Sequence, residues 1–185
     1  HQNLAIEADW SNAAFWYGAK CLGCPVEIGR LDQASVQGDR AIAGFYDQLQ
    51  GTGSLDLDVS QCPDLVPPLA AMAALRAGET TRIVNAGRLR IKESDRLATV
   101  TEVLNALGAK VEEYEDHLVI HGRERLAGGV TVSGHNDHRI AMMAAIAAIR
   151  CEAPVTITGA ECVKKSYPRF WEDYRRLGGE LICDI

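Results

Sequence analysis

The chain has 185 residues, of which 47% are hydrophobic and 24% are charged, and its formal net charge at pH 7 is −6. A chain of this length fits one domain or two small ones, and it buries about 70% of the surface that its unfolded form exposes. The acidic balance and the lack of a basic stripe argue against a nucleic-acid partner. No apolar run reaches the roughly 18 residues of a membrane span and no signal-peptide pattern opens the chain, so we expect a soluble protein without a membrane partner.

Six cysteines are spread along the chain. At this length they do not form the dense framework of a disulfide scaffold, and they indicate reduced thiols and a cytoplasmic location. Cys21 and Cys24 form one C-x-x-C motif, but neither a second such motif nor a nearby histidine pair completes a metal site. We therefore favour core or surface thiols over zinc or redox chemistry, and we expect no metal.

One order of elements recurs three times along the chain: an alternating strand, an aspartate, an Ala-rich helix, a second strand, and a second helix that ends at a glycine. In the first unit, residues 4–52, the first strand is 4–6, the aspartate is Asp9 and the first helix is 11–22. Its second strand is 26–28, and its second helix begins near Asp39 and ends at Gly51. In the second unit, residues 53–122, the first strand is 55–59, the aspartate is Asp64 and the first helix is 65–76. Its second strand is 81–84, its second helix begins near Asp95 and ends at Gly108, and an added hairpin follows at 111–114 and 117–121. In the third unit, residues 128–185, the first strand is 130–132, the aspartate is Asp137 and the first helix is 138–150. Its second strand is 155–157, and its second helix begins near Pro168 and ends at Gly178.

These repeats predict the fold class. One unit cannot bury its own hydrophobic faces, whereas three packed together can. Residues 141–149 are apolar nearly all round the predicted helix, which is typical of a buried helix. We therefore predict a single α/β domain over residues 1–185, built of three pseudo-symmetric repeats, with the Ala-rich helices near the axis and the sheets outside.

The stretch of residues 90–96 has the composition of an anion-binding site, because it holds three cations and two acids where a strand hands over to a helix. Ser94 is the expected N-cap of that helix. Backbone N–H groups and the helix dipole favour anions at such a position, and cationic side chains add charge-assisted hydrogen bonds. The alternative is a solvated helix start with local ion pairs.

Pseudo-symmetry brings equivalent loops to one end of the domain. That end would collect two carboxylates that can move protons and four cations: Asp64, Glu93, Lys92, Arg96, Arg139 and Lys165. Such a mixture shifts proton affinities in both directions, as acid/base chemistry on an anionic substrate requires. The alternatives are structural: an aspartate at a helix start is commonly an N-cap, as we expect for Asp9, His138 can be a hydrogen-bond partner, and Lys165 can be surface solvation.

At these residues the sequence resembles the 5-enolpyruvylshikimate-3-phosphate synthase (EPSP synthase) family. The matching segments are Arg-Ile-Lys-Glu-Ser-Asp-Arg at 90–96, Asn-Asp-His-Arg-Ile-Ala-Met at 136–142, Glu-Ala-Asp-Trp-Ser-Asn-Ala-Ala at 7–14 and Lys-Ser-Tyr-Pro at 165–168. The resemblance runs from about residue 4 to the end. It implies one domain of an inside-out α/β barrel, in which two domains of three βαβαββ units flank the active site. The chain resembles nearly the whole C-terminal domain. It lacks the N-terminal domain, which would be its partner, and a short chain-start segment that completes the C-terminal domain in the full protein.

The resemblance implies transfer of the enolpyruvyl group of phosphoenolpyruvate to the 5-hydroxyl of shikimate 3-phosphate, in the shikimate pathway to chorismate and the aromatic amino acids, without a cofactor. Asp64 would contact the shikimate hydroxyls and act as base, and Glu93 would deliver a proton to the methylene carbon. Lys92 would bind the shikimate-phosphate side. The cations expected to bind phosphoenolpyruvate are Arg96, Arg139 and Lys165. Arg88 stands where some members have a ligand-contacting asparagine, so position 88 is left out of the site.

Three other functions compete with this interpretation. An enolpyruvyl transferase acting on UDP-N-acetylglucosamine shares the repeats, but the Lys-Glu-Ser-Asp-Arg string argues against it. An RNA 3′-phosphate cyclase is disfavoured by the acidic balance. A non-catalytic anion-binding domain is the third. Since the chain begins with His1 rather than Met, we expect a piece of a longer protein that is inactive alone, because half of the cleft is missing.

Overall fold

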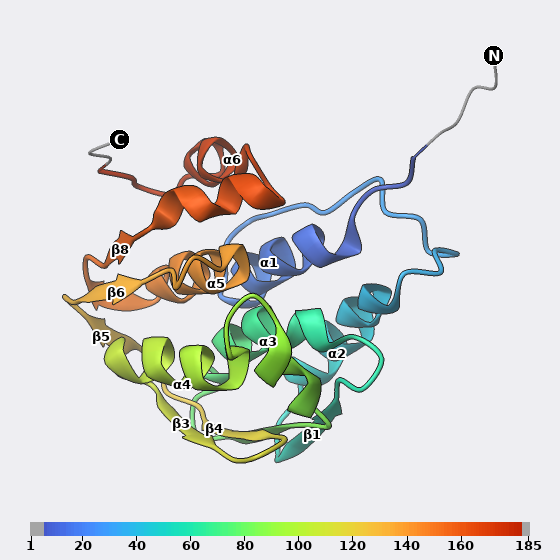
Figure 1. Ribbon diagram of the computed structural model, residues 1–185, viewed down its shortest axis with the longest axis horizontal. Helices are drawn as coiled ribbons and strands as arrows, with labels where there is room; N and C mark the ends of the chain where they lie inside the picture. The colour runs from blue at the N-terminus through green and yellow to red at the C-terminus, as the bar shows by residue number, and fades with distance from the viewer. Residues whose placement is uncertain (1–5, 183–185) are drawn as a thin grey trace.

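Three helices pack against one another in the middle of the molecule, in a computed structural model that describes residues 6–182 (Figure 1). These are α1 (Trp10–Cys21), α3 (Val66–Ala73) and α5 (His138–Ala148). Every residue of α3 is buried, and so is α5 from His138 to Ala147, whereas α1 buries only one face. The prediction of central Ala-rich helices is therefore confirmed, in full for α3 and α5.

The starts of the central helices follow from local chemistry. Asp9 caps α1 by accepting hydrogen bonds from the backbone N–H groups of Ser11 and Asn12, and Asp137 caps α5 by accepting from Arg139 N–H. These bonds satisfy donors that have no partner within the helix. α3 instead follows a short 3₁₀ turn, η2 (Pro63–Leu65), and has proline in its first turn, where a missing N–H costs nothing.

A four-stranded sheet covers one side of the central helices (Figure 1). Its strands are β1 (Leu55–Asp58), β2 (Thr80–Val84), β3 (Lys110–Glu113) and β4 (Leu118–His121), in the order β1-β2-β4-β3. β1 and β2 are parallel, whereas β4 is antiparallel to both β2 and β3. The added hairpin predicted for the middle unit is therefore confirmed. The inner face of this sheet packs into the core through four fully buried side chains, Leu57, Ile83, Leu118 and Ile120.

Two smaller parallel sheets accompany the third unit. β5 (Leu126–Gly128) pairs with β7 (Cys151–Ala153), and β6 (Thr131–Ser133) pairs with β8 (Thr156–Thr158). β6 and β8 match the two strands predicted for this unit with a shift of one residue.

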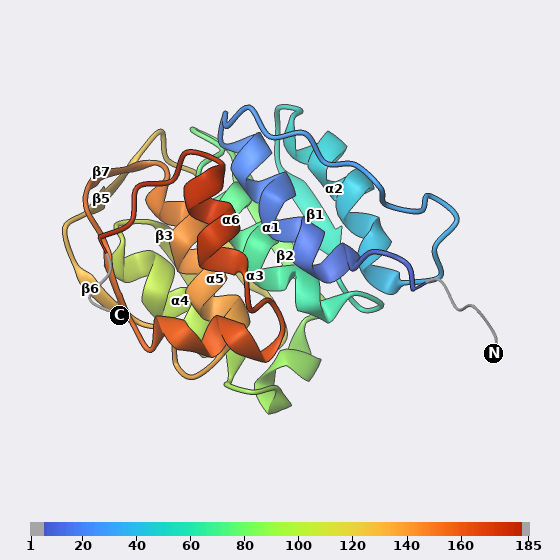
Figure 2. The same cartoon turned by 90° about the horizontal axis from the view of Figure 1, so that it is seen from above.

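The second helix of each unit is also present. These helices are α2 (Ile42–Leu49) after η1 (Gly38–Ala41), α4 (Arg96–Ala106) after η3 (Gly87–Ile91), and α6 (Phe170–Arg176) after η4 (Ala160–Lys165). Figures 1 and 2 both show α6 beside α1, where the rings of Phe170 and Trp16 stack. Within the described residues, no helix combines the length and the apolar character that crossing a bilayer requires.

Two predictions about local structure are wrong, the strand at 26–28 and the N-cap at Ser94. Residues 26–28 form no strand. Residues 4 and 5 of the predicted strand at 4–6 fall outside the described range, and Ile6, its described end, lies outside any strand. A strand exists only where a second strand completes its hydrogen-bond ladder, and residues 6–182 supply none here. Ser94 is not the N-cap of α4, because Asp95 takes that place and accepts from Ala98 N–H. The boundaries of the three repeats stay a prediction.

The buried packing of α3 predicts a large loss when it is truncated. Leu69 is fully buried, whereas Leu177 is 45% exposed. Leu69→Ala should lower the free energy of unfolding by about 2–5 kcal/mol, because it removes buried methyl groups and leaves a cavity. The matched Leu177→Ala should cost about 1 kcal/mol or less. Urea unfolding of both variants measures this difference, and equal losses would contradict the packing described.

Candidate functional site

A buried ion pair joins the starts of α4 and α5. Arg96 is the first residue of α4 and Asp137 caps α5, and their side chains are 1% and 0% exposed. The guanidinium donates from Nε to Asp137 Oδ2 at 2.8 Å and from Nη2 to Asp137 Oδ1 at 3.2 Å. This two-point contact fixes the plane of the guanidinium and therefore the directions of its remaining N–H groups.

The same guanidinium holds two further carboxylates. Arg96 Nη1 donates to Asp64 Oδ1 at 2.9 Å, and Nη2 donates to Glu93 Oε2 at 2.6 Å. Burial alone would lower the pKa of Arg96, but the hydrogen bonds and negative charge of Asp137, with those of Glu93 and Asp64, outweigh burial and raise that pKa. Arg96 therefore stays charged and organises carboxylates from three separate segments.

Asp64 lies between three cations. Its Oδ1 accepts from Lys92 Nζ at 2.9 Å as well as from Arg96, and its Oδ2 accepts from Arg139 Nη2 at 3.3 Å. Burial acts to raise the pKa of Asp64, yet Arg139, Lys92 and Arg96 together hold it below its ordinary value. The side chains of Asp64, Lys92 and Glu93 are 29%, 32% and 44% exposed, so solvent reaches this side of the cluster.

Arg139 has N–H donors that no acceptor among the described residues uses. Its side chain is 10% exposed, and within the described part of the chain its Nε and Nη1 atoms are buried without a hydrogen-bond partner. Buried N–H groups of a charged side chain are costly to leave unpaired. A bound anion would accept from both groups, as the planar fork of arginine is suited to do for carboxylate and phosphate.

The structure thus brings together five of the six residues that the sequence predicted for the site. They are Asp64, Lys92, Glu93, Arg96 and Arg139. Lys165, at the end of η4, lies next to the cluster rather than in it. Its Nζ donates to the backbone oxygen of Asn136 at 2.5 Å and to the Asn136 side-chain oxygen at 2.7 Å. Lys165 therefore reaches the residue before Asp137 and forms no ion pair with the other five.

Sequence reasoning missed what lies beneath the cluster. Asp137 was identified only as the acid that opens a helix, whereas it also holds Arg96. Ser94 donates to Asp137 Oδ2 at 2.9 Å and so turns inward instead of capping α4. Burial acts to raise the pKa of Asp137, but Arg96, the Arg139 N–H and Ser94 lower it. His138 is buried beside them, and burial together with Arg139 lowers its pKa, which keeps the imidazole neutral at pH 7.

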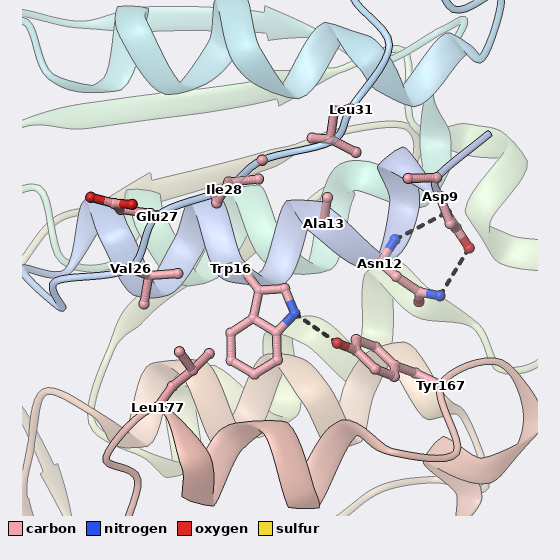
Figure 3. Close-up of a pocket in the computed structure, with 12 residues that line it drawn as sticks. Asp9, Asn12, Ala13, Trp16, Val26, Glu27, Ile28, Leu31, Tyr167 and Leu177 are labelled. Carbon is pink, nitrogen blue, oxygen red and sulfur yellow. Dashed lines mark hydrogen bonds between the residues drawn. The ribbon is translucent and has the colours of Figure 1, made fainter.

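A groove beside α1 has a different character from the charged cluster. This groove of about 350 Å³ lies between α1, residues 26–31 and the start and end of α6, where Trp16 Nε1 donates to the Tyr167 hydroxyl at 3.1 Å (Figure 3). Asp9 and Glu27 line it and no lysine or arginine does, so it does not suit an anion. None of the six predicted site residues lines the groove. Among the residues described, no group of three or more His, Cys, Asp or Glu side chains could hold a metal ion.

Comparison with known proteins gives consistent results. A family model described as EPSP synthase (3-phosphoshikimate 1-carboxyvinyltransferase) matches residues 1–174. The 3-phosphoshikimate 1-carboxyvinyltransferases of Clostridium acetobutylicum and Clostridium kluyveri are each 50% identical to the chain over 95% of its length. The chain covers 44% of each, so it spans less than half the length of these relatives.

A solved structure supports the same fold. EPSP synthase from Acinetobacter baumannii superimposes with a TM-score of 0.81 at 25% identity, covering 95% of the chain and 47% of that protein. The predicted fold class, one domain of an inside-out α/β barrel, agrees with this match.

The buried pair predicts a strong dependence of stability on Asp137. Asp137→Asn keeps a good N-cap but removes the charge beside Arg96, so it should lower the free energy of unfolding by roughly 3–5 kcal/mol. Asp56→Asn breaks the exposed pair with Arg82, whose side chains are 57% and 47% exposed, and should cost about 1 kcal/mol or less. Urea unfolding at pH 7 compares the two, and a loss at position 137 no larger than that at position 56 would contradict the pairing.

Acid should weaken the fold through the same carboxylates. The pKa values of Asp64 and Asp137 are lowered in the folded chain, so on acidification the unfolded chain takes up protons first. Their contribution to the free energy of unfolding is complete above the ordinary aspartate pKa. It is lost as the pH falls through the pKa values that the two groups have in the folded chain. Each group changes the free energy of unfolding by at most about 1.4 kcal/mol per pH unit. Urea titrations between about pH 6 and pH 3 should show this decline, and Asp137→Asn should flatten it; an unchanged slope would oppose the assignment.

Proposed function

The chain belongs to the EPSP synthase family, and from this premise we propose that its parent protein transfers the enolpyruvyl group of phosphoenolpyruvate to the 5-hydroxyl of shikimate 3-phosphate. The relatives named 3-phosphoshikimate 1-carboxyvinyltransferase, at 50% identity, support this activity. The reaction belongs to the shikimate pathway, and we place the parent protein in the cytoplasm. Because the chain spans less than half of these relatives, the remaining part of the parent would form the other wall of the cleft.

One observation carries the proposal. Three carboxylates, one of them the buried Asp137, and three cations meet at the starts of α3, α4 and α5, and the buried Arg139 has two N–H groups without an acceptor among the described residues. Both substrates are multiply charged anions. Fixed cations hold such substrates in place and stabilise the negative charge that develops as phosphate departs.

The roles of the carboxylates follow from the balance of protons. In the addition step, the 5-hydroxyl oxygen bonds to the central carbon of phosphoenolpyruvate, its proton passes to Asp64, and the methylene carbon takes a proton from Glu93. In the elimination step Glu93 takes a proton back from the methyl group, the carbon–carbon double bond forms again and the bond to phosphate breaks. The departing phosphate takes the proton held by Asp64, so both carboxylates return to their starting state. Lys92 binds on the shikimate-phosphate side, and Arg96, Arg139 and Lys165 bind phosphoenolpyruvate.

The electrostatics of the cluster support a base that is activated by its substrates. In the free chain three cations lower the pKa of Asp64, which makes it a weak base. Anionic substrates compete for Lys92 and Arg139, so their binding would raise the pKa of Asp64. Asp64 would then accept the hydroxyl proton only when both ligands are in place.

Phosphate release tests this function in the parent protein. With phosphoenolpyruvate and shikimate 3-phosphate together, the parent should release phosphate, and omission of shikimate 3-phosphate should abolish release. The 185-residue chain alone should show no turnover, because Lys92 and Glu93 stay hydrated on its open face. No release from the parent would contradict the proposed function, and turnover by the isolated chain comparable to that of the parent would contradict the need for a second wall.

Glu93→Gln separates chemistry from binding. The amide keeps the shape of the side chain but cannot deliver a proton, so kcat should fall by about 100-fold or more while KM for phosphoenolpyruvate changes little. Glu172→Gln alters an exposed carboxylate in α6 and serves as the matched control, with unchanged kcat. Equal losses in kcat and in phosphoenolpyruvate affinity would mean that Glu93 only positions the substrate.

A further inference from the structure

The segment that carries Lys92 and Glu93 has little support of its own. Residues 92–95 connect η3 to α4 without regular structure, and Ile91, Lys92 and Glu93 are exposed. Reactive side chains on such a segment need an external anchor, because a displacement of about 1 Å can reduce a rate by roughly 100-fold. Arg96 supplies one anchor at the end of the segment through its bond to Glu93.

Arg90 supplies a second anchor at the other end. Its Nη1 donates to both Asp95 oxygens, at 3.1 and 3.0 Å, and to Glu113 Oε1 at 2.5 Å. Its Nη2 donates to the backbone oxygen of Tyr114 at 2.7 Å, and its Nε donates to that of Glu115 at 3.2 Å. Every nitrogen of the guanidinium is therefore used.

These contacts close the segment into a ring and fasten the ring to the sheet. The bond to Asp95 spans residues 91–94, and Asp95 is in turn fixed as the N-cap of α4. The bonds to Glu113, Tyr114 and Glu115 tie the ring to the β3–β4 hairpin. That hairpin is held by its pairing with β2, and the N–H of Ala86 donates to Asp116 O at 2.7 Å beside it.

We propose that Arg90 is a positioning residue: it closes the 91–94 segment against the β3–β4 hairpin and thereby places Lys92 and Glu93 for the reaction. The kinetic consequence rests on the function proposed above, whereas the ordering of the segment does not. Lysine cannot take this role, because a single ammonium cannot reach two carboxylates and two carbonyl oxygens in a fixed plane. The Arg90 side chain is 29% exposed, so its ion pairs add little to global stability.

Kinetics of the parent protein test the proposal through three variants. Arg90→Gln should lower kcat about 10–100-fold with a smaller change in KM, and Arg90→Lys should recover only part of the loss. Arg82→Gln breaks an exposed ion pair on the neighbouring strand β2 and should leave kcat unchanged. The effects of Arg90→Gln and Glu113→Gln should be less than additive, because both open the same contact. Unchanged kcat in Arg90→Gln, or full recovery in Arg90→Lys, would overturn the proposal.

Backbone nitrogen-15 order parameters give a readout that does not depend on activity. At residues 92–94 they should fall from about 0.85 toward 0.6 in Arg90→Gln and stay unchanged in Arg82→Gln. Unchanged values in Arg90→Gln would overturn the proposal even if the parent lacks the proposed activity. If Arg90→Gln does not fold, Glu113→Gln provides the same comparison, and order parameters unchanged there would also overturn it. A wild-type parent without turnover would refute the proposed function alone, and the order parameters would then decide the role of Arg90.

Discussion

The buried pair of Arg96 and Asp137 is the interaction on which the rest of the site depends. It lies where α4 and α5 begin, and its two-point geometry directs the remaining N–H groups of Arg96 toward Asp64 and Glu93. Desolvating two charges is costly, so such a pair contributes little net stability compared with apolar packing. Its value here is positional: one guanidinium plane fixes carboxylates from three segments that are far apart in the sequence.

The repeated architecture explains why those segments meet. α3 and α5 each follow a strand and an acidic residue, and α1 follows Asp9, so the packing of α1, α3 and α5 against one another brings the loops before these helices toward one end. The second unit contributes Asp64 and the 90–96 segment, and the third contributes Asp137 and Arg139. In the first unit Asp9 caps α1 and forms no ion pair with the cluster, so the aspartates at equivalent places in the repeats carry different chemistry.

Much of the fold and of the site was predictable from the sequence, because periodicity and motif spacing are visible within short stretches of the chain. The Ala-rich runs identified the central helices, and the mixture of charges in residues 90–96 identified the segment that enters the charged cluster. The buried partner of Arg96 was not predictable, because an aspartate before a helix carries the same signal whether or not it also binds a distant arginine. The contact of Lys165 with Asn136 depends on the path of η4. Residues 26–28 form no strand because no neighbouring segment pairs with them among the described residues. Neither fact can be inferred from the local sequence pattern.

We propose above all that Arg139 binds an anion through its Nε–H and Nη1–H groups, which have no acceptor among residues 6–182. The Nε–H resonance of Arg139 in the arginine-labelled parent protein, followed during titration with inorganic phosphate, tests this most directly. A saturable shift is expected at Arg139, whereas the resonance of the exposed Arg82 should not move. No shift at Arg139, or equal and unsaturable shifts at both residues, would contradict it.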